Sequence, residues 1–201
     1  MEKLNKTGDV YLYLKQGKMT KPFMRDEEVF KKVQSDQMVN TKRSEIESLM
    51  AYIKHHLKPS EDENFKNKNK FRRTASQIWK SGVATGCADN ALVFATMARQ
   101  IGIPTTILET ADKSFLEEFA KDSSVKAYRG HFFCECFYHE KWVLVDPTFN
   151  KVMEDYDVNN LNLPYKVGKS SHYVSYLRET DIGKGRNIAE TNRKMIELSL
   201  R

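Results

Sequence analysis

The segment between Gly86 and Pro104 constrains the fold of this chain most. Apolar side chains recur there at helical spacing and cover most sides of a helix predicted over residues 87–100. A helix that is apolar on most sides is buried in the centre of a domain. Gly102 and Pro104 end it, so the sequence predicts a central helix with the rest of the chain packed around it.

Two runs of aromatic and β-branched residues, 131–138 and 141–146, predict a pair of strands. His139 and Glu140 between them suit a tight hairpin. Pro147 ends the second strand because proline cannot donate to a sheet ladder. A further strand is expected over residues 103–108, directly after the central helix.

The other elements have weaker patterns. Helices are expected over residues 26–33, 41–57, 75–80, 114–121 and 188–198, and a strand over residues 173–177. Residues 59–73 are polar and end in a basic run, 66–73, that could bind nucleic acid or another anionic surface. Only Phe71 interleaves with the charges, which favours a solvated loop and no nucleic-acid partner.

The composition is that of an ordinary globular protein. Of the 201 residues, 40% are hydrophobic and 30% are charged, which excludes a fully disordered chain. Without an internal repeat or a Gly/Ser linker, the chain is expected to be one domain over residues 1–201. No apolar run approaches the ~18 residues of a spanning helix and no secretory signal follows Met1, so we expect a cytoplasmic protein. A chain trimmed of its leader would look the same.

Cys87 is a candidate nucleophile. An odd cysteine count without a leader predicts reduced thiols, and the net charge of +6 favours acidic partners only weakly. Cys87 begins the central helix, where unpaired amides and the positive end of the helix dipole favour a thiolate. Gly86 before it would let a substrate approach the backbone closely. The alternative is a small buried apolar residue at a helix start.

The hairpin register brings His131 and Asp146 together. If Tyr138 faces Lys141, then Phe133 faces Asp146, and His131 points to the same side of the sheet as Phe133. Asp146 is then a diagonal neighbour of His131 within side-chain reach. A carboxylate there would fix the imidazole tautomer and make His131 a competent base for a cysteine. The alternative is a structural His–Asp pair, and a three-residue hairpin loop would separate the two residues.

Other residues on the 131–138 strand have other interpretations. Glu135 lies on the same face as His131 and needs a partner there, so it is expected to give structural support. His131, Cys134, Cys136 and His139 are spaced like zinc ligands. The two cysteines point to one face and the two histidines to the other, so we expect no metal site and no cofactor.

Three sequence pieces resemble the transglutaminase-like superfamily. Gly86-Cys87-Ala88-Asp89, with Arg99 and Gly102-Ile103-Pro104, is similar to its cysteine helix. His131 with Glu135, and the run from Trp142 to Thr148, are similar to its histidine and aspartate strands. The resemblance covers about residues 74–150, with a helical segment before it and a polar segment after it.

The resemblance implies an α+β fold with a papain-like, transglutaminase-like core, in which the cysteine helix packs on an antiparallel sheet. It also implies a Cys87–His131–Asp146 triad. Cys87 would attack a peptide or amide carbonyl, His131 would protonate the leaving amine, and Asp146 would orient His131. Gln77 and Trp79 are candidates for a second oxyanion donor.

We expect the resulting thioester to be hydrolysed, which makes the chain a cysteine peptidase acting on a protein or peptide substrate. Two alternatives follow from the same resemblance: a protein-glutamine transamidase, in which an amine replaces water, and a non-catalytic protein-binding module. The oligomeric state is left open.

Overall fold

The computed structural model describes residues 10–40, 44–122, 124, 129–170, 172–181, 194 and 197. The helices are a 3-10 helix η1 (Val10–Leu14), α1 (Asp26–Val39), α2 (Glu45–His56), α3 (Glu63–Asn69), α4 (Ala75–Ser81), α5 (Cys87–Gln100) and α6 (Lys113–Lys121). The strands are β1 (Lys58–Pro59), β2 (Val83–Ala84), β3 (Thr105–Asp112), β4 (Gly130–Tyr138), β5 (Lys141–Asp146), β6 (Lys151–Met153), β7 (Asn162–Leu163) and β8 (Tyr173–Glu179).

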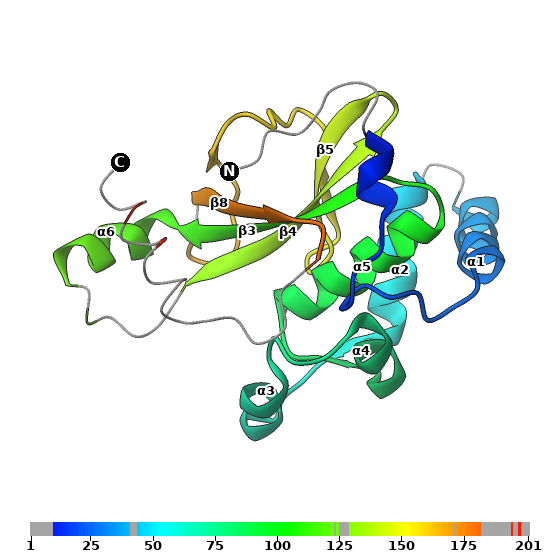
Figure 1. Cartoon of the computed structure of the whole chain (residues 1–201), viewed down its shortest axis with the longest axis horizontal. Coiled ribbons are helices and arrows are strands. Elements are labelled where there is room, and N and C mark those ends of the chain that lie inside the picture. Colours follow the sequence, from blue (N-terminus) through cyan, green and yellow to red (C-terminus); the bar gives the residue numbers. More distant parts are fainter. Residues whose placement is uncertain are drawn as a thin grey trace.

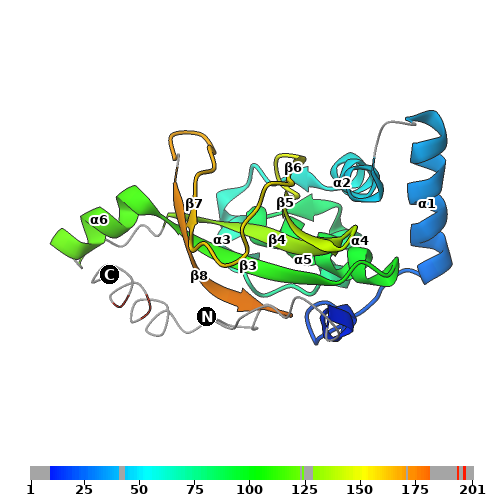
Figure 2. The same cartoon turned by 90° about the horizontal axis from the view of Figure 1, so that it is seen from above.

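A six-stranded sheet with the order β6-β5-β4-β3-β8-β7 forms the main layer, and every neighbouring pair in it is antiparallel. The short strands β1 and β2 form a separate parallel pair. Helices α1, α2, α4 and α5 gather toward one end of the molecule, and α6 lies at the opposite end (Figure 1). The view from above also separates α1 from α6 along the sheet (Figure 2). The expected α+β fold is confirmed.

Helix α5 is the buried centre that the sequence predicts. It spans Cys87–Gln100, and its apolar side chains join one core cluster with those of α2, α4 and β4. Its C-terminal end is tied to the sheet because the Arg99 guanidinium donates two hydrogen bonds to the carbonyl of Thr105, at 3.0 and 2.8 Å. Burial of this helix therefore sets the position of its first residue, Cys87, relative to the sheet.

The β4–β5 hairpin has the predicted register. Tyr138 faces Lys141 and Cys134 faces Val145. His139 and Glu140 form the turn, and both have positive φ, at 48° and 63°. Two positive φ values give the turn a twist that matches the twist of the flanking strands.

Three predicted elements differ from those observed. α1 continues to Val39 and does not end at residue 33, because the helix runs on through a polar stretch that carries no apolar periodicity. Residues 63–69, expected as part of a loop, form α3, whose first amides are capped by the Asp62 carboxylate. β3 begins after Pro104 and extends to Asp112, because its polar second half is paired with both β4 and β8.

The other expected elements are mostly present. α4 starts with a capping box between Thr74 and Gln77 and ends at Gly82, whose φ is 66°. The expected helix over 114–121 and strand over 173–177 correspond to α6 and β8. The expected C-terminal helix, 188–198, falls almost entirely outside the described residues. Within the described part of the chain, the helices are too short or too polar to cross a membrane.

Candidate active site

The loop before α5 is fixed by a buried ion pair. Asp89, in the first turn of the helix, accepts hydrogen bonds on Oδ2 from the amide and the hydroxyl of Thr85, at 2.7 and 2.8 Å. The same oxygen accepts a hydrogen bond from Arg73 Nη2 at 2.5 Å, and both side chains are buried. A Cβ added at Gly86 would meet nothing within 4 Å, so the backbone before Cys87 is open on that side.

Arg73 is a site-supporting residue that the sequence analysis missed. It ends the basic run 66–73, which was expected to be solvated, yet its guanidinium also donates to Ser81 and to the carbonyl of Val83. The signal that could have found it is the unpaired acidic residue Asp89 beside Cys87, because a carboxylate on a buried helix needs a partner.

Cys87 is half-buried at the first position of α5. Its thiol interacts with the His131 side chain and with the backbone of Phe132, and both interactions lower the pKa of the thiol. Burial raises the pKa of the Cys87 thiol, but the hydrogen bonds and charges of His131, the Phe132 amide and the charge of Lys70 outweigh it. The net pKa is therefore below the ordinary value, which favours a thiolate.

His131 and Asp146 form the buried pair that the register predicts. His131 Nε2 lies 2.9 Å from Asp146 Oδ2, and the two residues are 4% and 1% exposed. Asp146 Oδ1 accepts the amides of Thr148 and Phe149 at 2.9 and 3.1 Å, which fixes the carboxylate. Because Nε2 faces Asp146, Nδ1 is the ring nitrogen left to exchange a proton with Cys87.

The electrostatics of His131 favour its charged form. Burial alone would lower the pKa of His131, but hydrogen bonds to Asp146 and Cys87 and the charges of both outweigh it and raise the pKa to about 9. A lowered thiol pKa beside a raised imidazole pKa is the condition for a thiolate–imidazolium pair near neutral pH.

His131 lies at the end of β4 that β5 does not cover, and this position leaves it accessible to the N-terminus of α5. The β5 ladder pairs with β4 from Cys134 onward, so His131 and Phe132 lie beyond its end. Phe132, Cys134 and Cys136 pack in the same core cluster as α5. The N-terminus of α5 therefore meets the end of β4 at the point where β5 no longer pairs with it.

Aromatic rings enclose the imidazole. The ring centroid of His131 lies 4.7 Å from that of Phe133, 5.8 Å from Phe149 and 6.1 Å from Tyr173. Phe149 is 46% exposed, whereas Phe133 and Tyr173 are buried. The imidazole is thus shielded from water on the sheet side and lies beneath one partly exposed ring.

Glu135 has the partner that its apolar strand requires. Arg178 of β8 donates to its two carboxylate oxygens at 2.5 and 2.6 Å, and the hydroxyls of Thr106 and Tyr156 donate to it as well. This buried network joins β4 to β8 and to the segment after β6. The contacts of Glu135 thus link neighbouring strands of the sheet.

Cys134 and Cys136 are buried against α5, on the face of β4 opposite to His131. Burial raises the pKa of Cys136 to about 12 and that of Cys134 well above its ordinary value, so both are poor nucleophiles. Among the described residues, no three His, Cys, Asp or Glu side chains gather in a way that could hold a metal ion.

The two candidates for a second oxyanion donor, Gln77 and Trp79, make contacts within and beside α4. The Gln77 side chain closes the capping box by accepting the Thr74 amide at 2.9 Å. The Trp79 ring stacks on His56 with ring centroids 3.8 Å apart. Neither contact places a side-chain N–H group of these two residues at Cys87, so no second oxyanion donor is assigned.

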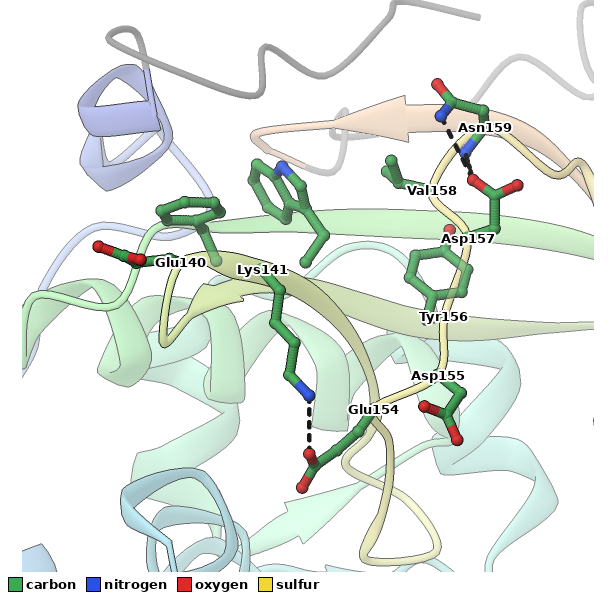
Figure 3. A pocket seen from close by; sticks show the side chains of 10 residues that line it. Glu140, Lys141, Glu154, Asp155, Tyr156, Asp157, Val158 and Asn159 are labelled. Atoms are coloured by element: carbon green, nitrogen blue, oxygen red, sulfur yellow. Dashed lines mark hydrogen bonds and ion pairs between the residues drawn. The ribbon is translucent and has the colours of Figure 1, made fainter.

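A pocket of about 510 Å³ lies apart from these residues. It is lined by the β4–β5 hairpin and the segment 154–159. Figure 3 shows the Lys141 ammonium of the hairpin donating a hydrogen bond to the Glu154 carboxylate of that segment. Neither Cys87, His131 nor Asp146 lines it. Chemistry, not cavity size, therefore locates the candidate active site.

Comparison with known proteins gives the family. Residues 31–147, more than half of the chain, match the transglutaminase-like superfamily. This chain belongs to the transglutaminase-like superfamily. The match begins well before residue 74, so the family likeness extends back through α2 and into α1, further than the sequence motifs indicate.

A solved structure supports the fold. The chain is similar to a candidate cysteine protease from Cytophaga hutchinsonii, with a TM-score of 0.51 and 12% sequence identity. The similarity covers 89% of this chain and 50% of the other, so this chain spans about half the length of that protein. At this identity the likeness concerns the fold alone. No curated protein matches the chain in sequence.

Proposed function

We propose that this member of the transglutaminase-like superfamily is a cysteine-dependent acyl-transfer enzyme with Cys87, His131 and Asp146 as its triad. The observation that carries the proposal is the buried His131–Asp146 pair, with its atoms 2.9 Å apart, next to a Cys87 thiol whose pKa His131 lowers. The helix start and the lowered thiol pKa support Cys87 as the nucleophile.

In the acylation step, the Cys87 thiolate attacks the carbonyl carbon of a peptide or amide, and its proton resides on His131 Nδ1. The carbonyl electron pair moves onto oxygen, where the Cys87 amide stabilises the oxyanion. When the carbonyl re-forms, the carbon–nitrogen bond breaks and His131 gives its proton to the leaving amine. The product is a thioester on Cys87. Asp146 keeps the imidazole oriented and stabilises its cationic form.

In the deacylation step, we propose that water is the acceptor. His131 removes a proton from water as the oxygen attacks the thioester carbon, and collapse of the intermediate expels the Cys87 thiolate and yields a carboxylic acid. An amine in place of water would give a transamidase with the same residues in the same roles.

Alkylation of the native protein across pH tests the nucleophile. Iodoacetamide should label Cys87 well below pH values of about 8.5, where an ordinary free thiol ionises, as measured by peptide mass spectrometry. Cys134 and Cys136 are internal references, because their burial predicts labelling only after unfolding. His131→Ala should remove the early reactivity of Cys87. Labelling of Cys87 only after unfolding would refute the proposal and favour the binding-module alternative.

A second experiment identifies the acceptor. A panel of glutamine-containing peptides is incubated with the protein in water labelled with the heavy isotope of oxygen, with and without a primary amine. The Cys87→Ala variant is the control. Hydrolysis predicts that heavy oxygen enters the acyl product even when the amine is present. Amine incorporation in place of oxygen would overturn hydrolysis and support transamidation.

A further inference from the structure

The basic run 66–73 contains a strained turn. Arg72 donates its amide to the carbonyl of Asn69 at 3.1 Å, and Lys70 between them has φ −56° and ψ 127°. Phe71 follows with φ 59°. This is a type II turn, whose third position normally takes glycine or asparagine because φ is positive there. A bulky aromatic residue in that conformation is an outlier, and such outliers gather at functional sites.

The strained residue attaches the turn to the candidate active site. The Phe71 ring lies 5.7 Å from the Phe132 ring, centroid to centroid, and packs against the core cluster that also contacts Cys87. The Phe132 backbone helps to lower the pKa of the Cys87 thiol. The turn therefore contacts, through one aromatic pair, a residue that acts on the proposed nucleophile.

The turn carries two exposed cations, Lys70 and Arg72. Lys70 is exposed, and its Nζ lies 5.4 Å from the centroid of the Phe71 ring. Within the run, Lys66 pairs with Glu63 and Arg73 with Asp89, whereas Lys68 and Arg72 are exposed. In the part of the chain that the structure describes, no carboxylate pairs with Lys70. Of the cations in the run, Lys70 is the one whose charge helps to lower the pKa of the Cys87 thiol.

We propose that Lys70 is a specificity-determining residue that binds a carboxylate of the substrate next to the bond that Cys87 attacks. The inference rests on the proposed function. Phe71 holds the turn against Phe132, and the exposed Lys70 ammonium lies over the outer part of the same turn, 5.4 Å from the centroid of the Phe71 ring. The carboxylate belongs either to an acidic side chain or to a free chain terminus, and both present the same chemistry to Lys70.

Paired alkylating reagents test the charge preference. Iodoacetate and iodoacetamide attack the same thiolate and differ by a carboxylate, so the ratio of their rates on Cys87 cancels the thiol pKa. Lys70→Met should lower the iodoacetate-to-iodoacetamide ratio by about two- to fivefold, the range of an exposed ion pair. Lys70→Glu should lower it further, and Lys70→Arg should keep it. Lys68→Met, which removes an exposed charge from the same run, should leave it unchanged.

The outcomes separate this inference from the proposed function. If neither reagent labels native Cys87, the proposed function fails and the inference fails with it. If Cys87 is reactive but Lys70→Met leaves the ratio at the wild-type value, the inference alone is wrong.

A second set of reagents distinguishes the source of the carboxylate. N-acetyl-aspartyl and N-acetyl-asparaginyl chloromethyl ketones compare an acidic side chain with its neutral counterpart. Iodoacetylglycine and iodoacetylglycinamide compare a terminal carboxylate with its amide. A preference for the acidic reagent that Lys70→Met abolishes in either pair identifies the source. A preference in neither pair contradicts the inference.

Discussion

Asp146→Asn should lower the pKa of His131 without disturbing the turn that carries residue 146. An asparagine Oδ1 can still accept the amides of Thr148 and Phe149, which the Asp146 Oδ1 now accepts. The change is therefore confined to the atom facing His131 Nε2, where a charged oxygen becomes an uncharged group.

The size of the effect follows from burial and distance. The imidazole is 4% exposed and lies 2.9 Å from the Asp146 oxygen, so solvent screens the pair only slightly. An opposite charge in such contact shifts a pKa by about 1–3 units. The pKa of His131 should therefore fall from about 9 to about 6–8. At 1.36 kcal/mol per unit, this is about 1.4–4 kcal/mol in the free energy of protonation.

The measurement is an NMR titration of the His131 ring, assigned by comparison with His131→Gln. Asp155→Asn is the matched control, because it removes one carboxylate charge from an exposed position. The reactivity of Cys87 should change with the titration. The thiolate–imidazolium pair exists at pH values above the pKa of Cys87 and below that of His131. Because Asp146→Asn lowers the pKa of His131, the upper pH limit of Cys87 reactivity should fall. A His131 that still titrates near pH 9 in Asp146→Asn would refute the assigned cause.

Two further substitutions test the buried ion pairs, both by urea unfolding. Asp89→Asn leaves the buried Arg73 guanidinium without its charged partner and should lower the free energy of unfolding by about 3–5 kcal/mol; it should also slow Cys87 alkylation, because the preceding loop loses its anchor. Glu135→Gln removes the charged partner of the buried Arg178 guanidinium and should lower the free energy of unfolding by a similar amount. The alkylation rate of Cys87 in the folded protein should change little. If either variant loses no more unfolding free energy than Asp155→Asn does, the prediction for that variant is wrong.

The part of the site that could be predicted from sequence is the part with short-range geometry. His131 and Asp146 belong to one hairpin, and the two-residue turn at His139 and Glu140 sets which side chains share a face. Cys87 could be recognised because a glycine and a helix start mark it in the sequence. The alternating geometry of strands and the helix dipole are enough for these inferences.

The part that could not be predicted depends on contacts between distant segments. Glu135 visibly needs a partner, but nothing local identifies Arg178, which lies 43 residues away on a strand two places across the sheet. The basic run was more misleading, because adjacent lysines and arginines have different environments. Arg73 is buried under Asp89, whereas Lys70 is exposed on a strained turn. Only tertiary packing separates these roles.

Trapping the acyl-enzyme tests the central claim most directly. The native protein is mixed with p-nitrophenyl acetate, quenched in acid, and digested for peptide mass spectrometry. The proposed mechanism predicts a burst of nitrophenolate and one acetyl group on Cys87, with both abolished in Cys87→Ala and strongly slowed in His131→Ala. An unmodified Cys87, with acetyl groups only on surface lysines, would contradict the assignment of Cys87 as the nucleophile.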